Sequence, residues 1–244
     1  MSITTPSPDR PTVVLVHGAF ADSSSWNGVI SSLLAKGYPV IAVANPLRGV
    51  ASDSAYLRTV LSDISGDVIL VGHSYGGSVI TNAAYGESSV KGLVYVGGFA
   101  PEAGESAADL SGRYEGGTLG DTLTAVPLPD GGTDLYIVQD RYHGQFAADS
   151  SAAVASVMAV GQRPITEAAL NEPSGEPAWK NVPSWFLFGS DDRNIPAASH
   201  RFMAERAGSR RTVELAGGSH TVGIPEAAQV VDLIVEAADT IGAR

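Results

Sequence analysis

The stretch that most constrains the fold of this chain runs from Gly72 to Gly76, where the sequence GHSYG has the pattern G-x-S-x-G. An apolar run at residues 68–71 precedes this stretch and predicts a buried strand. Residues 78–85 follow it with the length and composition of a buried helix. A serine on a sharp turn between a strand and a helix has its hydroxyl held above the edge of a parallel sheet. We therefore predict that Ser74 is a nucleophile.

Glycines on both sides of the serine support this interpretation. A Cβ atom at Gly72 or Gly76 would collide with neighbouring backbone in so tight a turn. The helix that follows would direct its free N–H groups and its partial positive charge toward the place where an anion forms. An ordinary loop can also contain Gly-Ser-Gly, but it accounts for neither the strand before the turn nor the helix after it.

Length and charge limit the classes of partner. With 244 residues, the chain is long enough to bury its own core as one α/β domain. Its 15 Lys and Arg residues stand against 26 Asp and Glu residues, which gives a net charge of −11. Nucleic acids and anionic membranes require positive patches, so we expect neither as a partner. The sequence has no cysteine, which excludes disulfides, thiolate catalysis and cysteine metal sites.

Cofactor motifs do not occur, and we expect no metal and no cofactor. The His, Asp and Glu residues do not cluster at metal-ligand spacings, and the glycines around Ser74 do not fit the G-x-G-x-x-G pattern of dinucleotide sites. The polar residues 1–11 lack an apolar signal core, and no apolar run approaches the roughly 18 residues of a membrane helix. We therefore expect a cytoplasmic protein.

Short apolar runs alternate with helical patterns along most of the chain. Besides residues 68–71, the predicted strands cover residues 12–16, 39–43, 91–98, 184–188 and 211–215. The predicted helices cover residues 26–37, 53–64, 78–85, 197–207 and 225–241. This alternation implies a six-stranded parallel sheet with helices on both faces.

The alternation breaks in residues 101–180, which are rich in Gly, Pro, Ala, Ser and acidic residues. This segment contains one predicted strand, 134–138, and two predicted helices, 145–160 and 166–171. It is too long for a plain connection and too structured for a linker. We interpret it as a cap inserted between the fourth and fifth strands, over the carboxyl edge of the sheet. Residues 1–100 and 181–244 then form the core domain.

A serine hydroxyl attacks only with the help of a base, usually a histidine that a carboxylate orients. Of the five histidines, His220 lies in a loop directly after the sixth predicted strand and before the last helix. This position places it at the carboxyl edge of the sheet, where Ser74 also emerges. We interpret the other histidines as structural, surface or packing residues: His17, His73, His143 and His200.

The orienting acid follows from chain order. The order Ser, acid, His that this arrangement uses places the acid after the fifth strand. Residues 189–196 contain two candidates there, Asp191 and Asp192, which sequence physics does not clearly separate. Glu102 and Glu105, after the fourth strand, are weaker alternatives.

Attack on an ester carbonyl places negative charge on its oxygen, and preorganised N–H groups must stabilise that charge. The first N–H group is expected from Tyr75, the residue after the nucleophile. The second is expected from the loop after the first strand, residues 17–20, where we choose Ala19.

Taken together, these stretches resemble the α/β-hydrolase superfamily over nearly the whole chain. The resemblance rests on HGAF at 17–20 with Trp26, GHSYGG at 72–77, residues 189–196, and GSH at 218–220. With six strands and none before the first, the chain looks like the compact branch of plant methylesterases, hydroxynitrile lyases and bacterial esterases. In that branch the acid is the Asp that is followed by two residues and then Ile/Val-Pro, which selects Asp192. The resemblance also implies an oxyanion donor at Ala19.

The chain departs from the lyases of this branch at two positions. Thr221 stands where they carry a Lys after the catalytic His, and Tyr75 stands where they typically carry a Cys. The resemblance also implies a cap that shapes the substrate pocket. By position, the candidates for lining this pocket are Phe20, Tyr75, Tyr136, Met158 and Trp179.

These observations predict a cofactor-free serine hydrolase that cleaves a small carboxylic ester or lactone. Ser74 would form an acyl-enzyme, with His220 as the base and Asp192 as the orienting acid. The same fold also supports C–C cleavage, haloperoxidase or perhydrolase chemistry and acyl transfer, and a ligand-binding receptor is a further alternative. The expected partner is a small molecule, and the sequence leaves a homodimer open.

Overall fold

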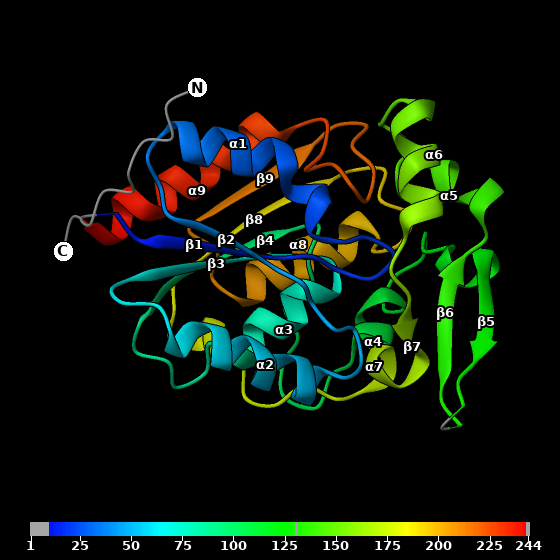
Figure 1. Ribbon diagram of the computed structural model, residues 1–244, viewed down its shortest axis with the longest axis horizontal. Helices are drawn as coiled ribbons and strands as arrows, with labels where there is room; N and C mark the ends of the chain where they lie inside the picture. The colour runs from blue at the N-terminus through cyan, green and yellow to red at the C-terminus, as the bar shows by residue number, and fades with distance from the viewer. Residues whose placement is uncertain (1–9, 130, 243–244) are drawn as a thin grey trace.

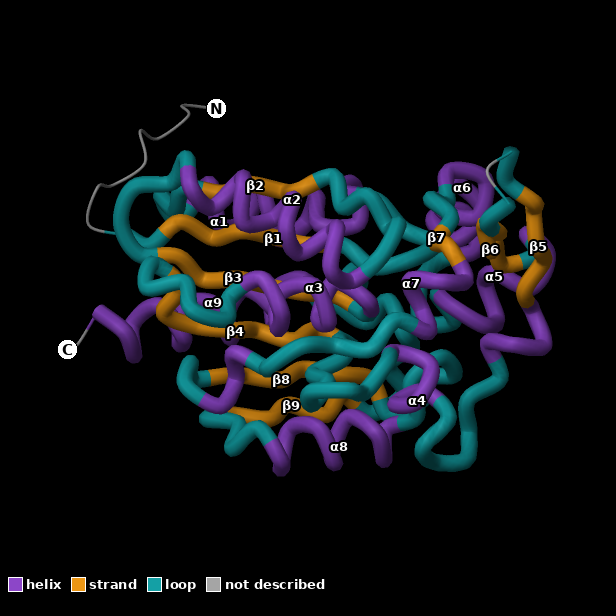
Figure 2. Tube along the Cα trace, turned by 90° about the horizontal axis from the view of Figure 1, so that it is seen from below, coloured by secondary structure: helices purple, strands orange, loops and turns teal. Residues whose placement is uncertain are grey.

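The computed structural model describes residues 10–129 and 131–242. Its central sheet has six parallel strands in the order β2-β1-β3-β4-β8-β9, which confirms the predicted sheet (Figure 2). The strands are β1 Thr12–Val16, β2 Val40–Val43, β3 Val68–His73, β4 Val90–Val96, β8 Ser184–Gly189 and β9 Arg211–Leu215. Most of the predicted polar tail, residues 1–9, lies outside the described residues.

Helices cover both faces of this sheet, and two apolar clusters fill the two interfaces (Figure 1). Successive residues of β1 face opposite clusters: Val14 packs in one, and Val13 and Leu15 pack in the other. This burial on both faces explains why the strands read as continuous apolar runs rather than alternating ones. One face carries α1 Asn27–Ala35 and α9 Ala227–Gly242, and the other carries α2 Val50–Ser62, α3 Tyr75–Ala83 and α8 Ala197–Arg206.

The chain between β4 and β8, residues 97–183, forms what we call the inserted segment. Its strands and α-helices lie beyond the carboxyl ends of the parallel strands, at the right of Figure 1. Its strands β5 Leu123–Pro127, β6 Thr133–Ile137 and β7 Ile165–Thr166 form a separate antiparallel sheet. Its helices are α4 Ala107–Ser111, α5 Gln139–Phe146, α6 Ala152–Gly161 and α7 Glu167–Asn171, with short 3-10 turns at Leu119–Thr122 and Ala178–Lys180.

The inserted segment differs from the sequence-based expectation in several elements. The helix predicted at 145–160 is wrong, because the chain turns at residues 147–151 and separates α5 from α6. Ser151 begins the second helix as its N-cap and accepts a hydrogen bond from the Val154 N–H. Strands β5 and β7 and helix α4 were not predicted, since they are short and β5 is largely exposed. The domain boundaries at 101 and 180 remain a prediction.

Candidate active site

Ser74 occupies a strained turn between β3 and α3. Its backbone angles are φ 52° and ψ −126°, a positive φ that a residue with a side chain rarely adopts. The Ser74 N–H donates to the Gly97 carbonyl at 3.1 Å, and the Ser74 carbonyl accepts the N–H groups of Gly77 and Phe99 at 2.9 and 3.1 Å. These backbone bonds to the loop after β4 hold the serine in its strained conformation.

The glycines of the turn are required by close backbone approach, as predicted. A Cβ atom at Gly76 would lie 2.3 Å from the Val16 carbonyl oxygen, and one at Gly72 would lie 2.7 Å from the Gly76 oxygen. Gly18 brings the loop after β1 against the serine in the same way, since a Cβ there would lie 2.5 Å from Cβ of Ser74. Only glycine permits these contacts, so β1, β3 and α3 meet directly around the Ser74 hydroxyl.

The two predicted oxyanion donors, Ala19 and Tyr75, lie next to the close approach of Gly18 and Ser74. Ala19 directly follows Gly18, and Tyr75 is the first residue of α3. No hydrogen bond joins the N–H group of either residue to an acceptor within residues 10–129 and 131–242. The Tyr75 hydroxyl reaches away to donate to Oδ2 of buried Asp53 at 2.9 Å, which fixes this helix start from its other side.

The structure brings Asp192, and not Asp191, to His220. Nδ1 of His220 lies 2.8 Å from Oδ2 of Asp192, and both side chains are fully buried. Oδ1 of Asp192 accepts the N–H groups of Asn194 and Ile195 at 2.8 and 2.9 Å. Asp191 is exposed and accepts the Ser190 hydroxyl instead.

The charge of Asp192 is stabilised inside the protein. Burial alone would raise its pKa, but the neighbouring His220 and the hydrogen bonds from His200 and His220 outweigh burial and lower the pKa below the usual range. Asp192 is therefore ionised at neutral pH, and Nδ1 of His220 donates to it. The other ring nitrogen of His220, Nε2, is buried without a hydrogen-bond partner in the described part of the chain.

Two other histidines hold the surrounding loops, as predicted. Nε2 of His73 donates to the His220 carbonyl at 3.0 Å, and burial followed by the nearby His220 lowers the His73 pKa to about 3. His17 receives the Asn45 N–H at Nε2, at 3.1 Å, so its Nδ1 donates to the Gly18 carbonyl at 2.9 Å. Both rings are neutral at pH 7 and act as fixed braces.

A comparison with known proteins identifies the fold. The alpha/beta hydrolase family matches residues 13–233, which is most of the chain. The chain belongs to this family. Its compact six-stranded sheet, with Ser74 after β3 and His220 after β9, agrees with the resemblance found in the sequence.

Relatives of this chain include an esterase. The chain is 26% identical to an alpha/beta hydrolase of Aspergillus novofumigatus, over 81% of this chain and 84% of the relative. It is 35% identical to a carbendazim hydrolyzing esterase of a Nocardioides species, over 40% of this chain and 46% of that esterase. The crystal structure of polyneuridine aldehyde esterase has the same fold, with a TM-score of 0.74 and 18% identity over 93% of this chain and 98% of that one.

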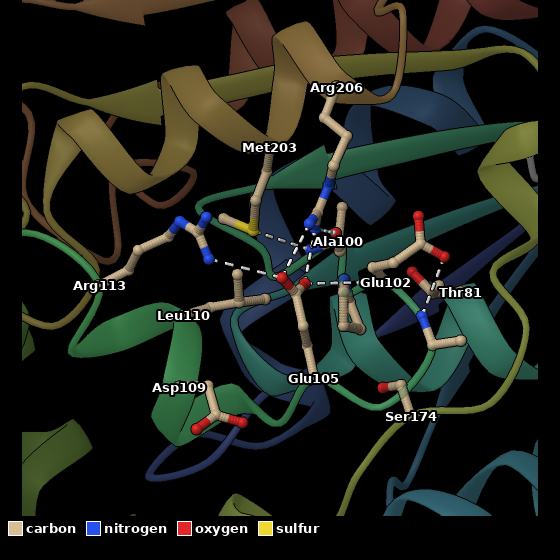
Figure 3. A network of polar contacts seen from close by, with 12 residues as sticks. Thr81, Ala100, Glu102, Glu105, Asp109, Leu110, Arg113, Ser174, Met203 and Arg206 are labelled. Carbon is tan, nitrogen blue, oxygen red and sulfur yellow. Dashed lines mark hydrogen bonds and ion pairs between the residues drawn. The ribbon is translucent and has the colours of Figure 1, made fainter.

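Glu102 and Glu105, the weaker candidates for the acid, lie in a separate ion-pair network (Figure 3). Glu105 accepts two hydrogen bonds from the Arg206 guanidinium, at 2.9 and 2.8 Å, and pairs with Arg113 at 3.6 Å. Glu102 pairs with Lys180 at 2.6 Å. Because these carboxylates bind cations of α8 and the inserted segment, neither of them orients His220.

A cavity of about 290 Å³ opens above Ser74. Most of the side chains that line it are apolar and many of them are small, and the inserted segment supplies much of the lining. The core contributes Ala19, Phe20, Ser74, Tyr75, Phe99, Asn194 and Ile195, and the inserted segment contributes residues that include Ala107, Ala108, Ser111, Leu119, Leu123 and Leu170.

The structure brings only some of the predicted pocket residues to this cavity. Phe20 and Tyr75 line it, whereas Met158 lines a different groove of about 560 Å³ between α6 and the start of α1. Trp179 lies away from the cavity, with its Nε1–H donating to the Pro101 carbonyl at 2.9 Å. Tyr136 is part of β6 and does not line the cavity above Ser74.

His200 is the residue near the site that sequence reasoning missed. Its complete burial agrees with the packing role expected as one alternative, but the sequence does not indicate that its Nε2 lies 3.1 Å from Oδ2 of Asp192. Its position at the end of the first turn of a helix after the acid loop gave a weak signal, because helix phase alone does not say which side faces the loop. In the described residues, no cluster of His, Asp and Glu is arranged to hold a metal, and no helix is long and apolar enough to cross a membrane.

Proposed function

We propose that this chain hydrolyses small carboxylic esters or lactones with Ser74 as the nucleophile. The observation that carries the proposal is the geometry of His220: its Nδ1 lies against the buried carboxylate of Asp192, and its Nε2 is buried with no partner in the described residues. A neutral imidazole held in this way is the base that a serine hydroxyl needs. Ser74 lies on the adjoining strained turn, and its chain neighbour His73 has its ring centroid 4.9 Å from that of His220.

The proposed reaction has two halves. Nε2 of His220 takes the Ser74 proton while Oγ attacks the ester carbonyl carbon, and the resulting imidazolium then gives this proton to the leaving alcohol. A water molecule next attacks the acyl-enzyme, with its proton going to the same nitrogen, and Ser74 leaves with that proton as the acid product forms. Asp192 remains ionised throughout and stabilises the imidazolium.

The oxyanion would bind between the N–H groups of Ala19 and Tyr75. Neither group donates to an acceptor within residues 10–129 and 131–242, so both are available without breaking an existing hydrogen bond. Preorganised donors of this kind stabilise the transition state more than the ground state. The Gly18 approach to Ser74, which places Ala19 near the nucleophile, supports this assignment.

Substrate size follows from the cavity. A volume of about 290 Å³ is at the lower end for small-molecule sites, and its mainly apolar lining suits a short acyl or alcohol group. The ester-cleaving relatives, carbendazim hydrolyzing esterase and polyneuridine aldehyde esterase, support the same reaction class. At the position where the lyases carry Lys, Thr221 is buried and offers no ammonium group.

The proposal includes the substrate class, partners, location and oligomeric state expected from the sequence. We retain a small-molecule ester or lactone as the substrate, with no nucleic acid or membrane partner. A cytoplasmic location and a homodimer also remain predictions.

The deciding experiment measures hydrolysis of p-nitrophenyl acetate, butyrate and octanoate by the unaltered protein and by Ser74→Ala. We expect turnover to be fastest on the short esters and to fall by roughly 10⁴-fold or more in Ser74→Ala. Ser78→Ala is the matched control, because Ser78 is buried on α3, the helix that follows Ser74, and lies outside the cavity lining. A folded Ser74→Ala protein with undiminished turnover would overturn the proposal.

A further inference from the structure

His200 gives the carboxylate of Asp192 a second histidine partner. Oδ2 of Asp192 lies 2.8 Å from Nδ1 of His220 and 3.1 Å from Nε2 of His200. Together with the two backbone N–H groups on Oδ1, the buried carboxylate has four neighbouring nitrogen atoms. His200 comes from α8 and His220 from the loop after β9, so separate elements converge on one oxygen.

The tautomer of His200 follows from its surroundings. An ionised carboxylate only accepts hydrogen bonds, so Nε2 of His200 must carry a proton. Nδ1 of the ring is buried and has no partner within residues 10–129 and 131–242. A second proton, on Nδ1, would give the His200 ring a positive charge and a buried N–H donor without an acceptor. This costs more free energy than leaving Nδ1 as an unpaired acceptor. His200 is therefore a neutral Nε2–H donor.

The residues that surround His200 also bear on its orientation and its neutral Nε2–H form. Phe188 of β8 stacks on the ring with centroids 4.8 Å apart and planes at 14°, which fixes the ring in the plane that reaches Asp192. Burial lowers the pKa of His200 despite the hydrogen bond to Asp192, and the imidazole of His220 acts in the same direction as burial. Glu214 of β9 is the other nearby charge, and it pairs with exposed Arg201.

We propose that His200 is a positioning residue for Asp192, and that its Nε2–H both fixes the carboxylate and diverts part of its charge from His220. This inference rests on the proposed function, since His220 is the base there. A carboxylate oxygen that accepts two N–H groups shares its charge between them, so it stabilises the His220 imidazolium less than it would with His220 alone. His200 thereby extends activity toward lower pH.

The variant His200→Phe removes the N–H donor and keeps an aromatic ring against Phe188. We expect the acidic limb of its kcat/KM profile to move upward by about 0.5–1 pH unit, because Asp192 then holds the protonated base more strongly. We also expect kcat to fall roughly 3- to 30-fold with little change in KM, because the carboxylate is less well fixed. His200→Gln, whose amide can donate in place of Nε2–H, should bring the acidic limb back toward that of the unaltered protein.

Glu214→Gln is the control for simple charge effects, because it removes the other nearby charge and leaves the hydrogen bond to Asp192 in place. We expect its acidic limb to coincide with that of the unaltered protein. The inference is wrong if the acidic limb of His200→Phe stays in place or moves downward, or if Glu214→Gln moves it as far as His200→Phe does.

A measurement on the unaltered protein tests the contact without relying on turnover or on a variant that folds. Nitrogen-15 NMR of the histidine rings should show His200 as a neutral Nε2–H tautomer at neutral pH. A cationic His200, or a proton on Nδ1, would overturn the inference. Absence of ester hydrolysis would overturn the proposed function and leave this NMR result to stand by itself, so the two failures are distinguishable.

Discussion

The carboxyl edge of the parallel sheet and the inserted segment carry different kinds of constraint. At the edge, Ser74, His220 and Asp192 are buried. Backbone hydrogen bonds join Ser74 to the loop after β4, and a Cβ atom at Gly76 would overlap the Val16 carbonyl of β1. In the inserted segment, β5 is largely exposed and Val157 of α6 is 74% exposed. The difference teaches that the residues at the sheet edge are fixed by long-range contacts, while parts of the inserted segment lie on a more loosely constrained surface.

The tolerance of the inserted segment for different side chains has a physical cause. Positions with open space or solvent around them tolerate side chains of several sizes, whereas close-packed backbone at a sheet edge tolerates almost none. Substitutions at the edge should therefore alter rate and stability, and those in the inserted segment should alter substrate preference.

After Ser74→Ala, the largest expected effect comes from Asp192→Asn. An amide in place of the carboxylate favours the wrong tautomer of His220 and cannot stabilise its imidazolium, so we expect kcat to fall by roughly 10³- to 10⁴-fold. Asp191→Asn is the matched neighbour, exposed and bonded to Ser190, and should change kcat by less than about 2-fold. Ester kinetics on both variants measure this, and equal losses in the two would contradict the placement of the acid.

The next prediction compares the effect of an added Cβ atom on stability at two glycines, Gly76 and Gly144. A Cβ atom at Gly76 would lie 2.3 Å from the Val16 oxygen, so Gly76→Ala should lower the free energy of unfolding by about 3 kcal/mol or more. A Cβ atom at Gly144 of α5 would meet no heavy atom within 4 Å beyond the backbone of its own helix, so Gly144→Ala should raise that free energy by about 0.5–1 kcal/mol. Urea denaturation of both variants tests this contrast, which would fail if the two shifts had the same sign.

The stability of the sheet edge should depend on pH through its neutral histidines. The His73 pKa is lowered from 6.5 to about 3, so between these values the unfolded chain holds a proton that the folded protein lacks. The free energy of unfolding then falls as pH is lowered below about 6.5, by roughly 1.4 kcal/mol per pH unit for this residue. His17 and His200, whose pKa values burial also lowers, contribute in the same direction.

His73→Gln isolates the His73 contribution and keeps an amide N–H near the His220 carbonyl. Denaturation between about pH 6 and pH 4 should show a slope that is smaller in this variant by roughly one proton. Asp53, whose pKa burial raises, acts oppositely at the acidic end, so the difference between the two proteins is the informative quantity. Parallel curves for the two proteins would show that His73 does not stay neutral in the folded state.

The smallest effect concerns the cavity wall supplied by the inserted segment. Leu170 of α7 lines the cavity above Ser74, and Leu170→Ala should enlarge it on the side away from the sheet. We expect kcat/KM for butyrate over acetate esters to rise roughly 3- to 10-fold, with kcat on acetate within about 2-fold. Leu34→Ala, on the exposed face of α1, serves as the control and should leave this ratio unchanged. An equal loss on every ester would mean that Leu170 supports the chemistry rather than the substrate preference.

The sequence alone predicts the parallel sheet, and it predicts that Ser74, His220 and the acid loop lie at the carboxyl edge of that sheet. Apolar runs bounded by turn residues are typical of buried parallel strands, and the glycines around Ser74 permit only a tight strand-to-helix turn. Chain order then placed His220 and the acid loop at the same edge. Local pattern is sufficient for the strands and for the turn at Ser74, because each depends on residues that are close in the sequence.

Only the tertiary structure decided which side chains meet across the chain. The resemblance in sequence selects Asp192 over Asp191, but only the structure shows that Asp192 contacts both His220 and His200. The break between α5 and α6, and the placement of Met158 and Trp179 away from the Ser74 cavity, have the same origin. Contacts between distant segments depend on packing, and packing is not encoded in the local spacing of residues.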